Sequence, residues 1–276
     1  MKISVIQMTA GESKVENLAK IERLVEEVVA RDRPDLVALP EMIAFICGET
    51  ERMADSGELF PGGDLFDAFS AIAKRHSINF LAGSAMESAG AENRVFNCAL
   101  LFDRQGELVT KYRKMHRFDA VLPNGMELKE SDFVDAGNDV VCVEVEGIKL
   151  GLSICYDLRF PELYRALADA GADVIFAPSA FQFQTGADHW EILLRARAIE
   201  TQCYVVAPDQ VGSFGGGKYS MWGHSMIVDP WGTVVAQVSN VEGSATATVD
   251  TKLIGNVRAR IPVRQHRRLN QPKTEG

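Results

Sequence analysis

Residues 99–109, ALLFDRQGELV, and residues 225–235, SMIVDPWGTVV, share one pattern of an apolar run, an Asp-x-x-Gly turn and a second apolar run. This pattern predicts a β-hairpin whose glycine stands where a positive φ is accessible. Because one such hairpin lies in each half of the chain, the sequence indicates an internal duplication.

The segments around each hairpin follow the same order. Short runs rich in Val and Ile alternate with amphipathic stretches of helical length, which is typical of α/β proteins. In the first half we predict strands at residues 3–8, 36–41, 78–86, 95–102 and 107–113, and helices at 15–30 and 65–76. In the second half we predict strands at 149–155, 174–178, 203–211, 225–228 and 233–238, and helices at 161–170 and 187–202. Each half is therefore predicted to be one β-α-β-α-β-β unit.

These two units predict a single α/β domain. Two sheets packed face to face with helices outside would bury the strands on both faces, giving a four-layer α-β-β-α sandwich with internal pseudo-two-fold symmetry. No low-complexity linker divides the halves, so we predict one domain at residues 1–262 and a polar C-terminal arm or tail at 263–276. Residues 118–139 lack periodicity, and long irregular segments inside compact domains often carry function.

Composition excludes several classes of protein. Of 276 residues 46% are hydrophobic, and 38 acidic against 29 basic side chains give a net charge of −9. No apolar run reaches the ~18 residues of a membrane span, and a strand-like run follows the initiator with no signal region before it, so we expect a cytoplasmic protein without membrane contact. The acidic balance argues against nucleic-acid binding. A run of basic residues lies near the end of the sequence: Arg258, Arg260, Arg264, Arg267 and Arg268. We interpret this run as a solvated or partner-facing tail, because no aromatic residues that could stack on bases are interleaved with it.

The strongest local signal is LSICYDLRFPE at residues 152–162, where a buried strand ends at Cys155 and a helix begins at Pro161. A thiolate at the end of a strand and near a helix N-terminus is stabilised by the positive end of the helix dipole. The alternative is that Cys155 is one more small buried hydrophobe. The other cysteines show no CxxC spacing, so we expect reduced thiols rather than a disulfide framework or a metal site: Cys47, Cys98, Cys142 and Cys203.

A thiol nucleophile needs a base and a donor for the oxyanion that its attack creates. Glu41 ends the apolar run LVALPE, where an unpaired carboxylate would be costly. Lys114 lies in the basic segment KYRKMHR, and a buried ammonium there could lower the thiol pKa and stabilise an oxyanion. The alternative interpretations are that Glu41 is a surface acid and that Lys114 lies in a solvated basic loop.

A Cys-His pair is a competing arrangement. The histidines considered as partners of Cys155 are His116, His189, His224 and His266. We interpret His189 and His224 as structural. The sequence has no zinc-ligand spacing. The glycine-rich segment GSFGGGK at residues 212–218 lacks the spacing of a phosphate loop and is interpreted as a flexible loop.

Taken together, ALPEM around Glu41, YRKMHRFD around Lys114 and GLSICYDLRFPEL around Cys155 resemble the signature blocks of the nitrilase, or carbon-nitrogen hydrolase, superfamily. The resemblance extends over the whole chain and implies an α-β-β-α sandwich. It also implies that Cys155 is the nucleophile, Glu41 the general base and Lys114 the stabiliser of the tetrahedral intermediate, assisted by the backbone N–H of Tyr156. Glu130 matches a second glutamate of the family, although the segment before it departs from the family pattern.

Within the superfamily, RARAIETQCYVVA, WGHSMIVDPWG and RQHRR resemble the Nit branch. That resemblance implies a cofactor-free amidase for a small 2-oxo acid amide, with deaminated glutathione as the expected substrate and 2-oxoglutaramate as the alternative. We expect the pocket to include Phe181, Gln182 and Thr185, in the loop after the strand at 174–178. The candidate cations for a substrate carboxylate are Arg159, Arg117 and Lys218. The alternative for Arg159 is that it holds the nucleophile loop.

The family also implies a homodimer, or a larger homo-oligomer, that pairs through helices near the nucleophile. A different class of hypothesis is an interaction protein that keeps the sandwich but has lost turnover. Reactive residue types at 41, 114 and 155 argue against that hypothesis.

Overall fold

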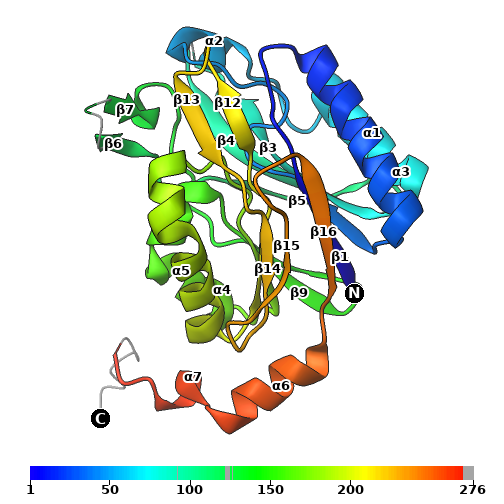
Figure 1. The fold of residues 1–276 in the computed structure, drawn as a ribbon, viewed down its shortest axis with the longest axis vertical. Coiled ribbons are helices and arrows are strands. Elements are labelled where there is room, and N and C mark those ends of the chain that lie inside the picture. Colours follow the sequence, from blue (N-terminus) through cyan, green and yellow to red (C-terminus); the bar gives the residue numbers. More distant parts are fainter. Residues whose placement is uncertain (92, 122–124, 126, 270–276) are drawn as a thin grey trace.

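The computed structural model describes residues 1–91, 93–121, 125 and 127–269. Two six-stranded sheets form its centre (Figure 1). The first sheet has the order β16-β1-β2-β3-β4-β5. Its strands are β1 (Lys2–Gln7), β2 (Leu36–Ala38), β3 (Asn79–Ser88), β4 (Val95–Phe102), β5 (Leu108–Arg113) and β16 (Gly243–Thr248).

The second sheet has the order β15-β14-β11-β10-β9-β8. Its strands are β8 (Cys142–Val145), β9 (Ile148–Leu152), β10 (Val174–Phe176), β11 (Tyr204–Ala207), β14 (Met226–Val228) and β15 (Val234–Gln237). In each sheet three parallel strands are followed by two antiparallel ones, β1-β2-β3 then β4-β5, and β9-β10-β11 then β14-β15. The outer neighbour of each first parallel strand is antiparallel, β16 beside β1 and β8 beside β9. The predicted duplication and sandwich are confirmed.

Alternation along β2 shows why the strands are apolar on both faces. Leu36 and Ala38 belong to the cluster of buried side chains shared with the second sheet. Val37, between them, packs instead with the residues under the helices, including Phe69. Successive side chains of a strand point to opposite faces, so a strand covered on both sides shows a continuous apolar run.

Helices cover the outer faces of both sheets. Figure 1 shows α1 and α3 on one side of the sandwich and α4 and α5 on the other. Their bounds are α1 (Lys14–Asp32), α3 (Asp64–His76), α4 (Pro161–Asp169) and α5 (Phe183–Thr201). Ser13 caps α1 by accepting a hydrogen bond from the N–H of Glu16, and Pro161 occupies the first turn of α4, where the missing N–H costs nothing. Helix α5 begins four residues before the predicted start at 187, so Thr185 lies in its first turn and not in a loop.

Several elements were not predicted because they lack clear periodicity. They are α2 (Thr50–Asp55), the short hairpin β6 (Asp119–Val121) and β7 (Glu127–Lys129), the hairpin β12 (Val211–Phe214) and β13 (Tyr219–Trp222), the strand β16 and the helices α6 (Thr251–Arg260) and α7 (Val263–His266). The interpretation of residues 212–218 as a flexible loop is wrong for residues 212–214, which belong to strand β12 of the hairpin β12–β13. Its glycines at 215–217 have positive φ and form the turn.

The basic segment near the C-terminus packs against its own domain. Arg258 of α6 pairs with Asp173 at 3.0 Å, and Arg267 pairs with Asp169 of α4 at 2.7 Å. Gln202, at the end of α5, donates to the carbonyl of Ile261 at 2.7 Å. These contacts hold α6 and α7 beneath the sandwich (Figure 1), so the described part of the run is not simply a solvated tail. The division into a domain at 1–262 and a tail at 263–276 stays a prediction, and residues 270–276 lie outside the described residues.

Candidate active site

Cys155 lies on a sharp turn at the carboxyl end of β9. Its φ is 45°, an uncommon value for a residue with a Cβ, and it begins a 3₁₀ turn, Cys155–Arg159. Its N–H donates to the carbonyl of Pro178 at 3.0 Å, which ties this turn to the loop after the neighbouring parallel strand β10. Tyr156 follows at the start of the turn, where N–H groups have no partner within the helix. This geometry presents the side chain of residue 155 and the next backbone N–H together.

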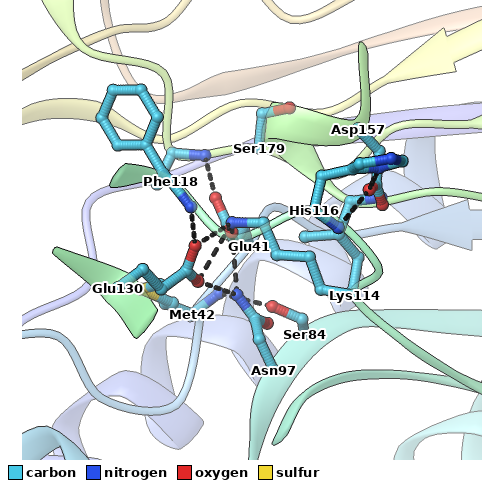
Figure 2. A network of polar contacts seen from close by, with 12 residues as sticks. Glu41, Met42, Ser84, Asn97, Lys114, His116, Phe118, Glu130, Asp157 and Ser179 are labelled. Atoms are coloured by element: carbon cyan, nitrogen blue, oxygen red, sulfur yellow. Dashed lines mark hydrogen bonds and ion pairs between the residues drawn. The ribbon is translucent and has the colours of Figure 1, made fainter. Parts of the chain in front are cut away.

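Asp157 supports the turn from within. Its buried carboxylate accepts hydrogen bonds from the N–H of Ile154 at 2.9 Å, the hydroxyl of Tyr112 at 2.7 Å and the N–H of His116 at 3.0 Å. Tyr112 is on β5 of the first sheet, so Asp157 connects the turn that carries Cys155 to the segment that carries Lys114. Figure 2 shows the Asp157–His116 contact beside Lys114.

Glu41 lies just beyond β2, at the same edge of the sandwich. Its turn packs over a bulge in β3, where the N–H of Ser84 donates to the carbonyl of Pro40 at 3.1 Å. Gly83 has φ +56°, and a Cβ there would lie 1.7 Å from the Pro40 carbonyl oxygen, so only glycine permits this approach. The Glu41 carboxylate is 2% exposed, and its Oε2 accepts from the N–H of Ala180 at 2.9 Å.

Lys114 joins two carboxylates. Its Nζ lies 2.9 Å from Oε1 of Glu41, and 3.0 Å and 2.9 Å from the two oxygens of Glu130 (Figure 2). Asn97, on β4, donates from Nδ2 to Oε1 of Glu41 at 2.8 Å and to Oε1 of Glu130 at 3.3 Å. Lys114 is 1% exposed and Glu130 is 7% exposed, so this network is shielded from water.

The charges of this network determine the protonation of its members. Burial would lower the pKa of Lys114, but Glu130 and Glu41 raise it well above its usual value, so the ammonium stays charged. Burial and the Glu41 carboxylate raise the pKa of the Cys155 thiol well above its usual value, although Lys114 and the Ala180 N–H lower it. Burial thus outweighs the local positive charge, and the balance favours the protonated thiol, whose proton a base must remove before attack.

A cavity of about 430 Å³ opens beside these groups, lined by Glu41, Lys114, Glu130 and Cys155 among others. Its apolar lining comes from segments distant in sequence: Met42, Ile46, Met53, Phe118, Phe133, Phe214, Tyr219 and Met221. Exposed charged side chains also line it: Glu49, Glu127, Lys129 and Asp132. The cavity is large enough for a small organic molecule whose reacting atom would lie next to Cys155.

A second cavity, of about 20 Å³, borders Cys155 and is formed by several residues that the sequence predicted for substrate contact. Arg159, Phe181, Gln182 and Thr185 all line it, together with Tyr156. Only Gln182 of these also lines the larger cavity. Arg159 contacts the Phe181 ring, with its guanidinium 5.2 Å from the ring centre, and contacts His189.

The remaining candidates have other partners. His116 Nδ1 lies 2.7 Å from Asp157, and its ring stacks on Phe160. His224 contacts the carbonyl of Trp222, and His266 belongs to α7. Lys218 is exposed with its ammonium over the ring of Tyr219, and among the residues that the structure describes Arg117 lines neither cavity. The base that interacts with the Cys155 thiol through its charge and a hydrogen bond is Glu41, and no histidine is among the main groups that shift the pKa of this thiol.

Sequence reasoning missed Asn97 and Asp157. Asn97 was detectable as a polar residue in the apolar run VFNCALLF, since a buried strand seldom holds an amide without a partner. Asp157 lies within the motif LSICYDLRFPE at residues 152–162, but no neighbouring residue indicates that its side chain would reach Tyr112.

Within the described ranges, no group of three or more His, Cys, Asp or Glu side chains is arranged to hold a metal ion. None of the helices in this part of the chain combines the length and apolar character that a membrane crossing demands.

Comparison with known proteins gives consistent matches over nearly the whole chain. A family model described as carbon-nitrogen hydrolase matches residues 2–259. A deaminated glutathione amidase of Synechocystis sp. (strain PCC 6803 / GT-S) is 40% identical over 265 residues, covering 95% of this chain and 96% of the relative. A deaminated glutathione amidase of Homo sapiens is 39% identical over 271 residues, with coverage of 96% and 82%.

Solved structures with the same fold include the NitFhit protein of C. elegans, with a TM-score of 0.88 and 36% identity over 97% of this chain. The chain spans 65% of that protein's length. Nit3 of Saccharomyces cerevisiae has a TM-score of 0.87 and 27% identity, covering 99% of this chain and 96% of Nit3.

Proposed function

This chain belongs to the carbon-nitrogen hydrolase family and is an enzyme that acts on amides, and we propose that its substrate is deaminated glutathione, cleaved by Cys155. The observation that carries the proposal is the convergence of Glu41, Lys114 and Cys155 at the wall of one cavity. Two relatives that are named deaminated glutathione amidase, from Synechocystis sp. and from Homo sapiens, support this substrate. Each is about 40% identical to this chain over 95% or more of its length.

The proposed reaction uses Glu41 as the base. Glu41 takes the proton of the Cys155 thiol as the sulfur attacks the amide carbon, which fits a thiol that is protonated at rest. Lys114 and the backbone N–H of Tyr156 stabilise the negative oxygen of the tetrahedral intermediate. Glu41 then donates the proton to the departing nitrogen, the C–N bond breaks, and an acyl thioester remains on Cys155.

Water completes the reaction. Glu41, again a carboxylate, removes a proton from a water molecule that attacks the thioester, and the second tetrahedral intermediate expels the Cys155 sulfur, which regains a proton. The products from deaminated glutathione are 2-oxoglutarate and cysteinylglycine. Glu130 touches Lys114 with both oxygens and is proposed to orient its ammonium. This scheme requires no cofactor.

Substrate carboxylates require cations near Cys155. Deaminated glutathione has two carboxylates, and we propose that Arg159 pairs with one of them across the smaller cavity. Phe181, Gln182 and Thr185 are proposed to line the acyl side of the site. Lys129 is the candidate for the second carboxylate, because it lines the larger cavity and is exposed, although Glu127 holds it at 3.0 Å.

The test compares release of cysteinylglycine from deaminated glutathione with release of ammonia from 2-oxoglutaramate, using the same purified protein. The proposal expects a higher kcat/KM for deaminated glutathione. An equal or higher value for 2-oxoglutaramate would assign the enzyme to the alternative substrate. No turnover of either amide, together with an unreactive Cys155, would support the non-catalytic hypothesis.

We also propose a cytoplasmic homodimer formed through α5. Three large apolar side chains of this helix are strongly exposed: Phe183 (50%), Ile192 (70%) and Ile199 (52%). Light scattering of the wild type and of Ile192→Asp tests the dimer, with Val15→Asp on α1 as the control because Val15 is 78% exposed. A wild-type monomer, or a dimer that Ile192→Asp leaves unchanged, would overturn this interface.

A further inference from the structure

The buried network around Lys114 contains more negative than positive charge. Glu41 and Glu130 are both carboxylates, and Lys114 is the one ammonium that pairs with both of them among the residues that the structure describes. All three are at most 7% exposed, so water does little to separate the two like charges. Two buried carboxylates near one another ordinarily hold a proton between them unless other groups stabilise both charges.

Backbone donors stabilise the outer oxygen of each carboxylate. The N–H of Ala180 donates to Oε2 of Glu41 at 2.9 Å, and the N–H of Phe118 donates to Oε2 of Glu130 at 2.6 Å. Lys114 contacts Oε1 of both residues as well as Oε2 of Glu130, and the two Oε1 atoms have a second source of donors.

Asn97 is that second source. Its Nδ2 and the Nζ of Lys114 both contact the same two oxygens, so that the four atoms Nζ, Oε1 of Glu41, Nδ2 and Oε1 of Glu130 form a closed ring. The backbone carbonyl of Asn97 also accepts from the backbone N–H of Lys114 at 2.8 Å, which fixes the two residues relative to one another. Asn97 is 0% exposed, and Figure 2 shows it beside Glu41, Glu130 and Lys114.

The orientation of the Asn97 amide follows from its neighbours. Two carboxylate oxygens can only accept hydrogen bonds, so the nitrogen of the amide faces them. The amide oxygen, Oδ1, has no partner within the described part of the chain. The side chain therefore forgoes one hydrogen bond in order to place both of its N–H groups between the carboxylates, a cost that folding alone does not explain.

We propose that Asn97 is a positioning residue of the proposed amidase reaction, whose amide holds the carboxylates of Glu41 and Glu130 in place around Lys114 and so keeps Glu41 aligned as the base for Cys155. An amide can donate two hydrogen bonds without carrying a charge. The charged or titratable groups that act on Glu41 are Lys114 after β5, Glu130 after β7, Cys155 after β9 and Asp209 after β11.

The test measures the rate at which iodoacetamide alkylates Cys155 as a function of pH, because this readout does not depend on knowing the amide substrate. The variants are Asn97→Asp, which keeps the shape but replaces the donors with a carboxyl group, and Asn97→Leu, which removes the donors without adding charge. In both, the Glu41 carboxylate loses a donor that holds it in place, so removal of the Cys155 proton is impaired and the alkylation rate at neutral pH falls by about tenfold, the size of one charge-assisted hydrogen bond.

Asn79→Asp is the matched control. Asn79 is also a buried asparagine whose Nδ2 contacts two acceptors, the carbonyl of Asp35 at 3.2 Å and Oε1 of Glu146 at 2.8 Å, but it lies at the start of β3 away from the site. The substitution lowers the melting temperature without changing the alkylation rate of Cys155. If either Asn97 variant folds and keeps the wild-type alkylation rate, the proposal is overturned. Alkylation that is slowed in the Asn97 variants, together with a wild type that does not cleave deaminated glutathione, would instead refute the substrate alone.

Discussion

The hydroxyl of Tyr112 donates to the carboxylate of Asp157 at 2.7 Å, and this bond joins the two sheets at the point where the candidate active site forms. Tyr112 stands two residues before Lys114, and Asp157 stands two residues after Cys155. The distance between the proposed nucleophile and the proposed oxyanion stabiliser is therefore set by this buried contact.

Tyr112→Phe removes the contact without leaving space. We expect a loss of about 1 kcal/mol in the free energy of unfolding, and about a tenfold loss in kcat with KM nearly unchanged, because the reacting groups lose their alignment. Steady-state kinetics and denaturant unfolding measure the two effects. Tyr204→Phe is the control, since the hydroxyl of Tyr204 contacts the N–H of Asp250 outside the site. Equal effects of the two substitutions on kcat would refute the alignment role.

Gly83→Ala places a methyl group 1.7 Å from the carbonyl oxygen of Pro40, at a φ of +56°. The turn that carries Glu41 must then move, so we expect a loss of roughly 3 kcal/mol or more in stability and a loss of amidase activity in any protein that folds. Gly90→Ala is the control, because its φ is +76° but nothing lies within 4 Å of the added Cβ. It costs about 1 kcal/mol from backbone strain alone. Comparable losses in the two variants would show that the close approach to Pro40 is unimportant.

Asp209 predicts a dependence of stability on pH. Burial and the charge of Glu41 raise the pKa of its carboxyl well above the usual value, while the N–H of Phe181 lowers it, and Oδ2 has no hydrogen-bond partner among the described residues. The folded state therefore binds this proton more tightly than the unfolded chain does. Its contribution is complete below the unfolded-state pKa of about 4 and is lost as the pH rises toward the folded-state pKa.

Asp209→Asn imitates the protonated carboxyl and should raise the melting temperature at pH 7, with a difference from the wild type that shrinks as the pH falls toward about 4. Asp173→Asn should do the opposite at pH 7, because Asp173 pairs with Arg258 at 3.0 Å. A lower melting temperature for Asp209→Asn at neutral pH would contradict this interpretation.

Cys155 is expected to be a thiol in the resting protein, because burial and Glu41 raise its pKa. The ultraviolet difference spectrum between the wild type and Cys155→Ser should show no thiolate absorbance at pH 7. A thiolate signal at that pH would indicate a preformed ion pair with Lys114 and would make Glu41 unnecessary as a base for the first step.

Local patterns predicted much of the fold and the reactive residue types. The two Asp-x-x-Gly hairpins identified the duplication, and the strand ends identified Glu41 and Cys155, because alternation, turns and strand termini are encoded in neighbouring residues. The partners of Asn97 could not be predicted, since Glu41 and Glu130 reach it from other segments of the folded chain. The cavity wall at Phe214 and Tyr219 was missed for the same reason, as a glycine-rich hairpin has no periodicity to reveal it.

The central claim, that Cys155 forms an acyl intermediate with Glu41 as its base, is tested most directly by intact-protein mass spectrometry after rapid acid quenching. Wild-type protein mixed with excess deaminated glutathione should gain the mass of one 2-oxoglutaryl group, located on Cys155 by peptide mapping. Glu41→Gln and Cys155→Ala should gain none and should release no cysteinylglycine. Hydrolysis by Cys155→Ala, or an adduct on a different cysteine, would contradict the account.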